Sequence, residues 1–459
     1  MSIQEPYEII EEILRLIEED RRDEALEIIA ALLPADKAAT FEEMEPELQE
    51  QLLSMIDPDE AADILEEMSY DDAAALAESL DTDALVQVLD EMEPDEAADL
   101  LGDLDPSLRS EALDAMEDSD EVRSLLRYPD DSAGGLMTSE YYEFPEDETA
   151  GQVLRRIREQ PRPDEEIPYI YTTDSRGRLM GVTRLADLIR AHPEQTLSDI
   201  ARAEVVSVAA EEDQETAARL MQRYDLMALP VLDHQGRPIG IITADDAMTA
   251  LEEEASEDLY KAAGILTLEG IEAARSDLLV RGPLLHTWWV RIPILIVGMF
   301  GGLLAGAVIG IYEEALEAVT MLAFFIPVVM DMGGSAGVQS TAVFIRGHAL
   351  GQIDTEQRFI RHFVREMLVG VSMGVMLGGL AGLIAALWQG SPELGLVVGL
   401  SLASTMTLAV GLGFLIPYTL LKLGMDPAAG SDPLITMIKD LTGLFIYFFF
   451  AIQFLGALM

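Results

Sequence analysis

The sequence lacks cysteine entirely and contains few basic residues. Without cysteine, the 459-residue chain has neither disulfides nor thiolate metal sites. Lysine and arginine total 29 against 84 acids, which leaves a formal net charge of -55. Only four of these bases are lysines, and such an acid-rich, lysine-poor composition fits a protein kept soluble at high salt. Because proteins that bind DNA or RNA carry basic patches, this charge argues against nucleic acid as a partner.

Histidine is also scarce, and its five copies form no metal-binding pattern such as His-Glu-x-x-His. We find no nucleophile–base set of the kind that a membrane-bound hydrolase would need, so the chain is not expected to be an enzyme. The first 30 residues contain no apolar run like that of a signal peptide. The N-terminus is therefore expected to stay in the cytoplasm.

Long hydrophobic runs, in contrast, fill the last third of the chain. Soluble helices of this length would show a polar face, whereas five stretches are apolar enough to cross about 30 Å of hydrocarbon as helices. They are residues 292–312, 318–345, 367–392, 394–421 and 441–459. With a cytoplasmic N-terminus, all eight bases from Arg281 onward fall inside, as the positive-inside rule requires. Five spans then place the C-terminus outside.

The acids are unevenly distributed between the two parts of the chain. Before Arg281 there are 73 acids and 21 bases, whereas the remainder has 11 acids and 8 bases. An acidic front is thus joined to a nearly neutral, apolar back. Two acids belong to the expected spans: Asp331 within the second and Asp440 at the start of the fifth. A carboxylate in the bilayer is energetically costly, and acids found there usually have a function. Both are therefore candidate cation ligands.

The first part of the acidic front contains a repeat. Residues 58–63 recur unchanged at 94–99, 36 residues later, each time at the start of a leucine-rich helical pattern. Proline followed by acids is typical of a helix start, and a repeat of this length predicts stacked helix pairs in a short superhelix. We therefore expect residues 1–128 to form an all-helical N-terminal domain.

After Tyr128 a pattern of helix, strand, turn, strand and helix occurs twice. The expected strands are 167–173 and 179–182, then 228–232 and 239–243. This duplicated α+β unit resembles a pair of CBS domains, which are regulatory and often bind adenine nucleotides. The expected domains are CBS domain 1 at 129–200, CBS domain 2 at 201–250, an acidic connecting (plug) helix at 244–270 and a transmembrane domain at 271–459.

The order of these parts is similar to that of the MgtE family of magnesium channels. Two motifs in the spans carry this resemblance: Gly-Gly-Ser-x-Gly-x-Gln at 333–339 and Asp-Leu-Thr-Gly-Leu at 440–444. A third motif, Ala-Gly-Gly-Leu-Met-Thr at 133–138, matches the family's entry into the first CBS domain. The family signature has asparagine where this chain has Ser335, a difference that bears on cation preference.

The resemblance implies a Mg²⁺ channel or transporter of the plasma membrane that works as a homodimer, with the pore on the symmetry axis. Asp440 matches the residue that holds the pore ion; the alternative is an interfacial acid paired with Lys439. Asp331 is a second candidate, in the pore or its vestibule. At the glycines we expect irregular backbone facing a water-filled path, with close helix packing as the alternative. The expected pore lining comprises Pro327, Gly333, Gly334, Ser335, Gln339 and Thr436.

The resemblance also implies that intracellular Mg²⁺ closes the pore. Clustered carboxylates repel one another, and cations that bridge them favour the closed state if they bind it more tightly. The expected sensor ligands are Asp95, Asp99, Asp225, Asp246, Glu254 and Glu257, for each of which a solvated acid is the plain alternative. Tyr169 and Asp187 match positions near ATP in the family, so ATP is a candidate regulator.

Two other functions stay open at this point. The transported ion could instead be Mn²⁺, Co²⁺ or Zn²⁺, because Ser335 replaces the signature asparagine. A CBS-regulated solute carrier or anion channel is the second alternative. Anion pores have cationic linings, whereas the charges inside the expected spans are acids, which argues against an anion pore.

Overall fold

The computed structural model describes nearly all of the chain, in two compact units. One unit extends to Glu254 and the other starts at Ala255. The described residues are 6–19, 21–117, 119–159, 168–262, 265, 284–349, 352–353, 358–428 and 431–456.

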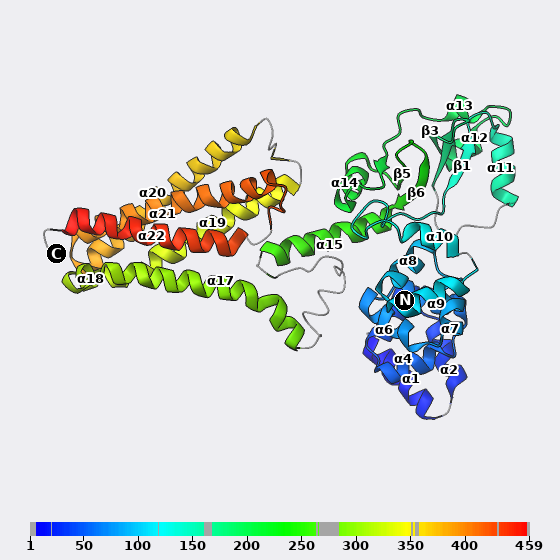
Figure 1. Ribbon diagram of the computed structural model, residues 1–459, viewed down its shortest axis with the longest axis horizontal. Coiled ribbons are helices and arrows are strands. Elements are labelled where there is room, and N and C mark those ends of the chain that lie inside the picture. Colours follow the sequence, from blue (N-terminus) through cyan, green and yellow to red (C-terminus); the bar gives the residue numbers. More distant parts are fainter. Residues whose placement is uncertain are drawn as a thin grey trace. The chain divides into compact units, whose positions relative to one another are not determined.

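Short helices form the first part of the acidic region (Figure 1). They are α1 (Pro6–Glu18), α2 (Arg22–Ala30), α3 (Pro34–Glu42), α4 (Pro46–Leu53), α5 (Pro58–Glu66), α6 (Tyr70–Ser79), α7 (Thr82–Leu89), α8 (Pro94–Asp103), α9 (Pro106–Ala115) and α10 (Ser119–Leu125). The prediction of an all-helical N-terminal region is therefore confirmed. The helices from α3 to α9 begin at residues 34, 46, 58, 70, 82, 94 and 106. One 36-residue repeat thus contains three helices, whereas the repeat length had suggested stacked helix pairs.

Carboxylates at the ends of these helices hold the repeat together. Alternate helices pack on one another, so that α3, α5, α7 and α9 form one stack and α4, α6, α8 and α10 another. In four places an acid accepts a hydrogen bond from a backbone N–H 27 residues further along, at the start of a later helix. The pairs are Glu42–Ser69 at 2.8 Å, Glu66–Glu93 at 2.9 Å, Glu78–Asp105 at 3.1 Å and Asp90–Glu117 at 3.0 Å. Part of the acidity is therefore structural, because these N–H groups have no partner within their own helix.

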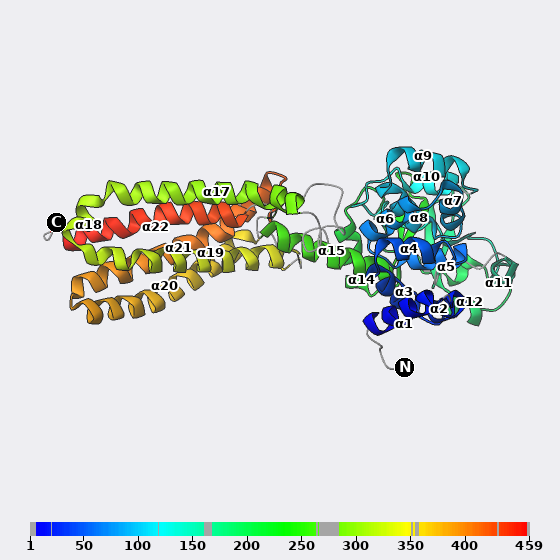
Figure 2. The same cartoon turned by 90° about the horizontal axis from the view of Figure 1, so that it is seen from below.

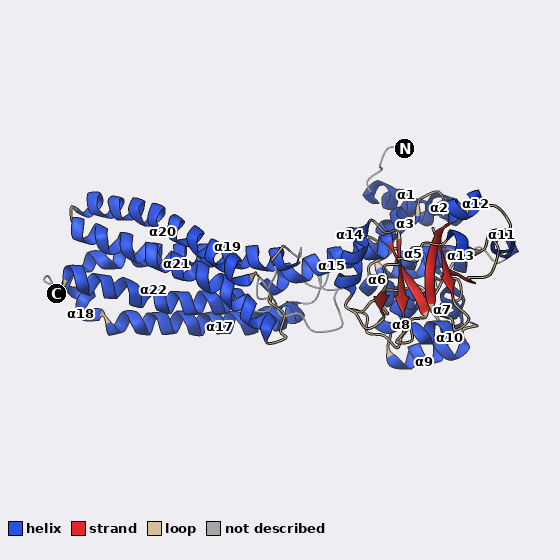
Figure 3. Cartoon of the chain, turned by 90° about the horizontal axis from the view of Figure 1, so that it is seen from above, coloured by secondary structure: helices blue, strands red, loops and turns tan. Residues whose placement is uncertain are grey.

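Two matching three-stranded sheets follow (red in Figure 3). The first contains β1 (Tyr142–Pro145), β2 (Tyr169–Thr173) and β3 (Leu179–Arg184), and the second contains β4 (Val208–Ala209), β5 (Ala228–Leu232) and β6 (Pro238–Thr243). In each sheet the first pair of strands is parallel and the second pair antiparallel. The associated helices are α11 (Ala150–Glu159), α12 (Leu185–Arg190), α13 (Leu197–Ile200) and α14 (Gln214–Tyr224). The duplicated α+β pattern is confirmed; residue 167 of the first expected strand lies outside the described residues.

The second unit is a bundle of long apolar helices that α15 (Ala244–Ala262) precedes in the chain (Figure 2). The long helices are α17 (Leu284–Ile311), α19 (Ile326–Ala349), α20 (Phe359–Gln389), α21 (Pro392–Lys422) and α22 (Ser431–Leu455). Two short helices, α18 (Glu313–Ala318) and the 3-10 helix η1 (Thr320–Phe324), join α17 to α19. By length and composition, five helices of the described chain can cross a membrane, which confirms the predicted spans.

Small residues let the helices of the bundle approach closely. α21 packs against α19, α20 and α22 and has the most buried of the five apolar segments. A methyl group at Gly374, Gly378 or Gly382 of α20 would collide with the backbone of α21. Helices in lipid associate through such contacts because there is little hydrophobic driving force between them. α19 and α22 both pack against α21 and also contact each other.

Candidate functional site

One side of α19 carries three exposed residues of the predicted pore lining together with Asp331. Pro327, Asp331, Ser335 and Gln339 are each four residues apart, and all four are exposed. Residues at this spacing lie on the same face of a helix. The stripe therefore offers a carboxylate, a hydroxyl and an amide, and these are oxygen groups of the kind that a hydrated dication contacts.

The signature glycines lie on the buried side of α19. This helix is a continuous α-helix from Ile326 to Ala349, so the expected irregular backbone with freed carbonyls is wrong. A methyl group at Gly333 would lie 2.9 Å from Thr405 Cγ2, and one at Gly337 would lie 3.2 Å from Ile435 Cγ2. The alternative, close packing through small residues, describes Gly333, Gly334 and Gly337 in this structure.

Thr436 and Asp440 lie four residues apart on α22, so they too share a helix face. Thr436 is exposed, whereas the Asp440 side chain is 18% exposed. The Nζ atom of Lys439 lies 3.0 Å from Asp440 Oδ1, which is an ion pair. Oδ1 is buried and accepts no hydrogen bond from the described residues, so the contact with Lys439 is an ion pair without a hydrogen bond. The alternative to metal binding, a pairing of Asp440 with Lys439, is therefore present, and the role of Asp440 as an ion ligand stays a prediction.

Lys439 is buried between α19 and α22. Its side chain is 6% exposed, and its ammonium donates a hydrogen bond to the backbone carbonyl of Met330 at 2.9 Å. Gly334 leaves the room for this ammonium, because a methyl group at that position would collide with Nζ. One glycine of the signature thus accommodates a cationic side chain from α22.

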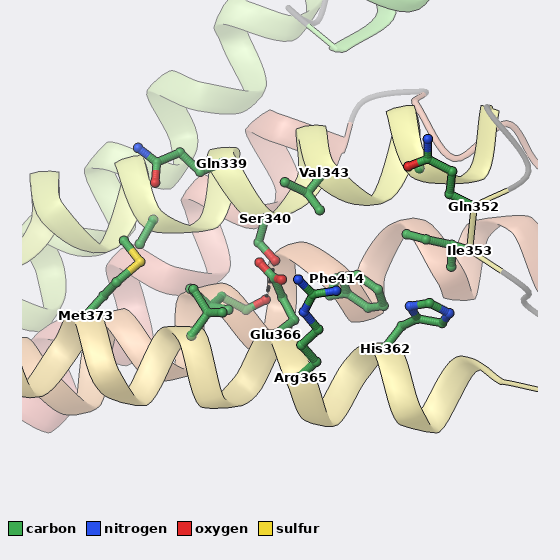
Figure 4. Close-up of a pocket in the computed structure, with 14 residues that line it drawn as sticks. Gln339, Ser340, Val343, Gln352, Ile353, His362, Arg365, Glu366, Met373 and Phe414 are labelled. Atoms are coloured by element: carbon green, nitrogen blue, oxygen red, sulfur yellow. Dashed lines mark hydrogen bonds between the residues drawn. The ribbon is translucent and has the colours of Figure 1, made fainter.

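A cavity of about 450 Å³ lies between α19, α20 and α21 (Figure 4). Arg365 and Glu366 extend from α20 toward Ser340 of α19, and Gln339 also contributes to the lining. Of the predicted pore lining, only Gln339 borders this cavity, whereas the other residues lie on the remainder of α19 and on the face of α22 with Thr436 and Asp440.

In the first unit, α8 and the start of α15 bring several acids together. Burial raises the pKa of Asp99 well above its usual range, and the negative charges of Asp95, Asp130 and Asp246 add to this effect. Burial raises the pKa of Glu96 in the same way, with Asp95 and Asp99 as the strongest repelling charges. Carboxylates that repel one another gain from a cation that neutralises them.

Asp246, at the start of α15, completes this cluster of Asp95, Glu96, Asp99 and Asp246. Burial raises the pKa of Asp246, although Thr243 Oγ1 donates a hydrogen bond at 2.5 Å that opposes the shift. Within the described residues no three acids, histidines or cysteines stand close enough to hold a metal ion directly.

The other predicted sensor acids have different surroundings. Asp225 is exposed and ends α14 in the left-handed conformation, with φ at 52°. Glu254 accepts a hydrogen bond from Gln214 Nε2 at 3.0 Å. Glu257 pairs with Lys261, whose Nζ also lies 2.7 Å from Asp426 Oδ2. Burial would lower the pKa of Lys261, but its hydrogen bonds to these two carboxylates raise it above the ordinary lysine value.

The two predicted nucleotide-binding residues, Tyr169 and Asp187, lie on β2 of the first sheet and on α12, which directly follows β3. Tyr169 of β2 is paired with Arg184 of β3 in the antiparallel ladder. Asp187 of α12 accepts hydrogen bonds from Arg184 Nε at 2.7 Å and Nη2 at 3.1 Å. The hydrogen bonds from Arg184 lower the pKa of Asp187. An aromatic ring, a guanidinium and a carboxylate thus meet here, and these groups can contact a base, phosphates and a ribose.

Comparison with known proteins assigns the family. A family model described as a divalent cation transporter matches residues 326–450, the MgtE intracellular N domain matches residues 9–84 and 32–131, and a CBS domain matches residues 197–253. The magnesium transporter MgtE of Thermus thermophilus is 39% identical over 328 residues, which are 71% of each chain. The chain belongs to the MgtE family. The MgtE magnesium transporter of Bacillus subtilis is 35% identical over 74% of this chain and 73% of its own.

Two solved structures support the fold of the first unit. The cytosolic domain of the Mg²⁺ channel MgtE in complex with ATP is 35% identical, with a TM-score of 0.50 over 52% of this chain and 99% of that chain. The soluble part of a magnesium transporter is 28% identical, also with a TM-score of 0.50, over 55% of this chain and 100% of its own. The chain is therefore a multi-pass membrane protein with an MgtE-type cytosolic region.

Two features of this MgtE chain are not predicted from the sequence. Glu96 joins the acidic cluster of α8 and α15, and its place between Asp95 and Asp99 in the repeat was a usable signal. The burial of Lys439 between α19 and α22 had no such signal, because a lysine beside an aspartate at the start of a span is expected to reach water.

Proposed function

We propose that this MgtE chain transports Mg²⁺ across the plasma membrane and closes when intracellular Mg²⁺ rises. The supporting observation is the arrangement of acids: Asp440 lies on an apolar helix within the matched transporter region, and acids of α8 and α15 lie close enough to repel one another. Transport of an ion requires no set of catalytic residues, and the chain belongs to a transporter family.

In the pore, Asp440 would contact the water molecules of a largely hydrated ion. Mg²⁺ requires octahedral oxygen ligands and gives up water reluctantly, so a wide, oxygen-lined passage suits it better than a tight cage. Thr436, Ser335 and Gln339 supply further oxygens on the exposed faces of α22 and α19. We place this passage on the axis of a homodimer, where Asp440 faces its own copy. In the proposed membrane orientation the C-terminus lies outside the cell.

Closure follows from the repulsion within the acidic cluster. Without a cation, the charged forms of Asp99, Glu96 and Asp246 oppose the contact between α8 and α15. Mg²⁺ relieves that repulsion and so favours the state in which the contact forms. Asp225, Glu254 and Glu257 belong to the proposal as further ligands of the closed state. ATP, bound near Tyr169 and Asp187, is proposed as a second regulator.

The test is uptake into liposomes that contain the purified full-length protein. The Mg²⁺ concentration is varied on the side of the membrane that carries the cytosolic region. Mn²⁺, Co²⁺ and Zn²⁺ are offered in competition for uptake. We expect saturable Mg²⁺ uptake that falls as Mg²⁺ rises on the cytosolic side. Preference for another dication would support the alternative raised by Ser335, and uptake of an organic solute without a dication would support a solute carrier.

A further inference from the structure

A lysine ammonium inside the transmembrane bundle is unusual and needs an explanation. Lys439 is 5% exposed as a residue and lies in the fifth apolar helix, beside Asp440. A buried charge in a span is costly, and such residues face the bundle interior or a water-filled path and pair with other groups. Here the ammonium has two such partners, the carbonyl of Met330 and the carboxylate of Asp440.

The place of the ammonium is built into both helices of the proposed pore. On α19, the absence of a side chain at Gly334 creates the space for Nζ, and a methyl group at Gly333 would lie 3.8 Å from Lys439 Cδ. The acceptor, Met330, stands one turn before Gly334 on the same helix. The Lys439 side chain therefore lies along the glycine pair, and its charge stays within 3.0 Å of the Asp440 carboxylate.

We propose that Lys439 is a tethered counter-ion of Asp440 that sets how tightly the pore holds a dication. The inference rests on the proposed role of Asp440 as the pore ligand. A Mg²⁺ ion whose water contacts Asp440 also approaches the ammonium, and the two positive charges repel each other. Lys439 thereby weakens cation binding at this point of the pore.

Weaker binding has a functional consequence for a conducting site. A pore ion has to bind well enough to enter and weakly enough to leave. In the proposed homodimer two carboxylates would meet at the axis, and two adjacent ammonium groups would balance their charge. Lys439 is in this sense a positioning and affinity-setting residue that acts through Asp440.

The experiment measures the initial rate of Mg²⁺ uptake against external Mg²⁺ for the full-length protein in liposomes. Lys439→Met removes the charge and keeps a side chain of similar length. We expect the half-saturating Mg²⁺ concentration to fall about tenfold, because one repelling charge is lost, while uptake is retained. A packing defect would lower the maximal rate without tightening binding, so the two explanations differ in their readout.

The matched control is Lys422→Met, which removes an exposed lysine at the end of α21. It should leave the half-saturating concentration within about twofold of the wild type. Gly334→Ala is a second variant, which displaces the ammonium but leaves Lys439 in the chain. It should also lower the half-saturating concentration, and it decides the question if Lys439→Met does not insert as a folded protein.

Asp440→Asn in the same assay separates this inference from the proposed function. Uptake equal to the wild type in Asp440→Asn would overturn both the pore assignment and the role of Lys439. Loss of uptake in Asp440→Asn, together with an unchanged half-saturating concentration in Lys439→Met or in the folded substitute Gly334→Ala, would overturn the Lys439 inference alone.

Discussion

Among single residues, the two carboxylates of the spans differ in their surroundings. Asp331 is exposed near the start of α19, and Asp440 is mostly covered and paired with Lys439. Sequence reasoning identifies both from the cost of a charge in the bilayer. The family resemblance ranks Asp440 first, but the sequence does not predict how deeply Asp440 is covered, because that depends on a lysine rotamer and on a glycine more than 100 residues away.

We predict that Asp331→Asn lowers Mg²⁺ uptake only at low Mg²⁺. An exposed acid near a pore entrance raises the local cation concentration, an effect that falls with ionic strength. At low salt the half-saturating Mg²⁺ concentration should rise about threefold with an unchanged maximal rate. Glu393→Gln, which alters an exposed acid at the start of α21, is the control. A complete loss of uptake in Asp331→Asn would instead make this residue a ligand of the pore ion.

A second prediction concerns the carboxylates that join the N-terminal helices. Glu42 accepts a hydrogen bond from the backbone N–H of Ser69, which directly precedes α6. Glu42→Ala leaves this N–H without that partner, so we expect a loss of about 1 kcal/mol in the free energy of unfolding. Thermal unfolding followed by circular dichroism measures it, with Glu50→Ala, an exposed acid of α4, as the control. Equal stability of both variants would return Glu42 to the class of solvated acids.

At the scale of elements, the helical spans and the duplicated sheets follow from patterns in the sequence, whereas the helix count of the repeat does not. The proline at the start of α5 and α8 marks a helix, but α6 and α7 between them begin with Tyr70 and Thr82. Their starts carry no proline and are missed. The continuity of α19 through its glycines is likewise decided by packing on α21 and α22, which no local pattern contains.

The contact between α8 and α15 should depend on pH when Mg²⁺ is absent. The pKa values of Glu96, Asp99 and Asp246 are raised in this arrangement, so the contact is favoured below their ordinary pKa and lost as the pH rises through the raised values. Because the chain has no cysteine, spin labels can be placed at Glu91→Cys and Glu252→Cys, both exposed positions.

Without Mg²⁺, the short-distance population between these labels should grow as the pH falls from about 8 to about 5. With saturating Mg²⁺ it should be large at both pH values, because the cation replaces the proton as the neutralising charge. A distance distribution that responds to neither pH nor Mg²⁺ would contradict the sensor role of the acidic cluster.

At the scale of the whole molecule, the proposal connects an acidic cytosolic region to closure of a pore. A variant lacking residues 1–128 removes α8 and with it Asp95, Glu96 and Asp99. We predict that uptake persists and that the half-inhibitory Mg²⁺ concentration on the cytosolic side rises about tenfold, since the closed state loses part of its preferential Mg²⁺ binding. Inhibition identical to that of the full-length chain would remove the N-terminal helices from the sensing mechanism.

The central claim is that a dication crosses the membrane past Asp440, and one substitution tests it most directly. Asp440→Asn keeps the size of the side chain and removes its charge. Uptake of Mg²⁺ by liposomes containing this variant, at a protein content and oligomeric state equal to the wild type, should fall to that of protein-free liposomes. Uptake at the wild-type rate would contradict the account.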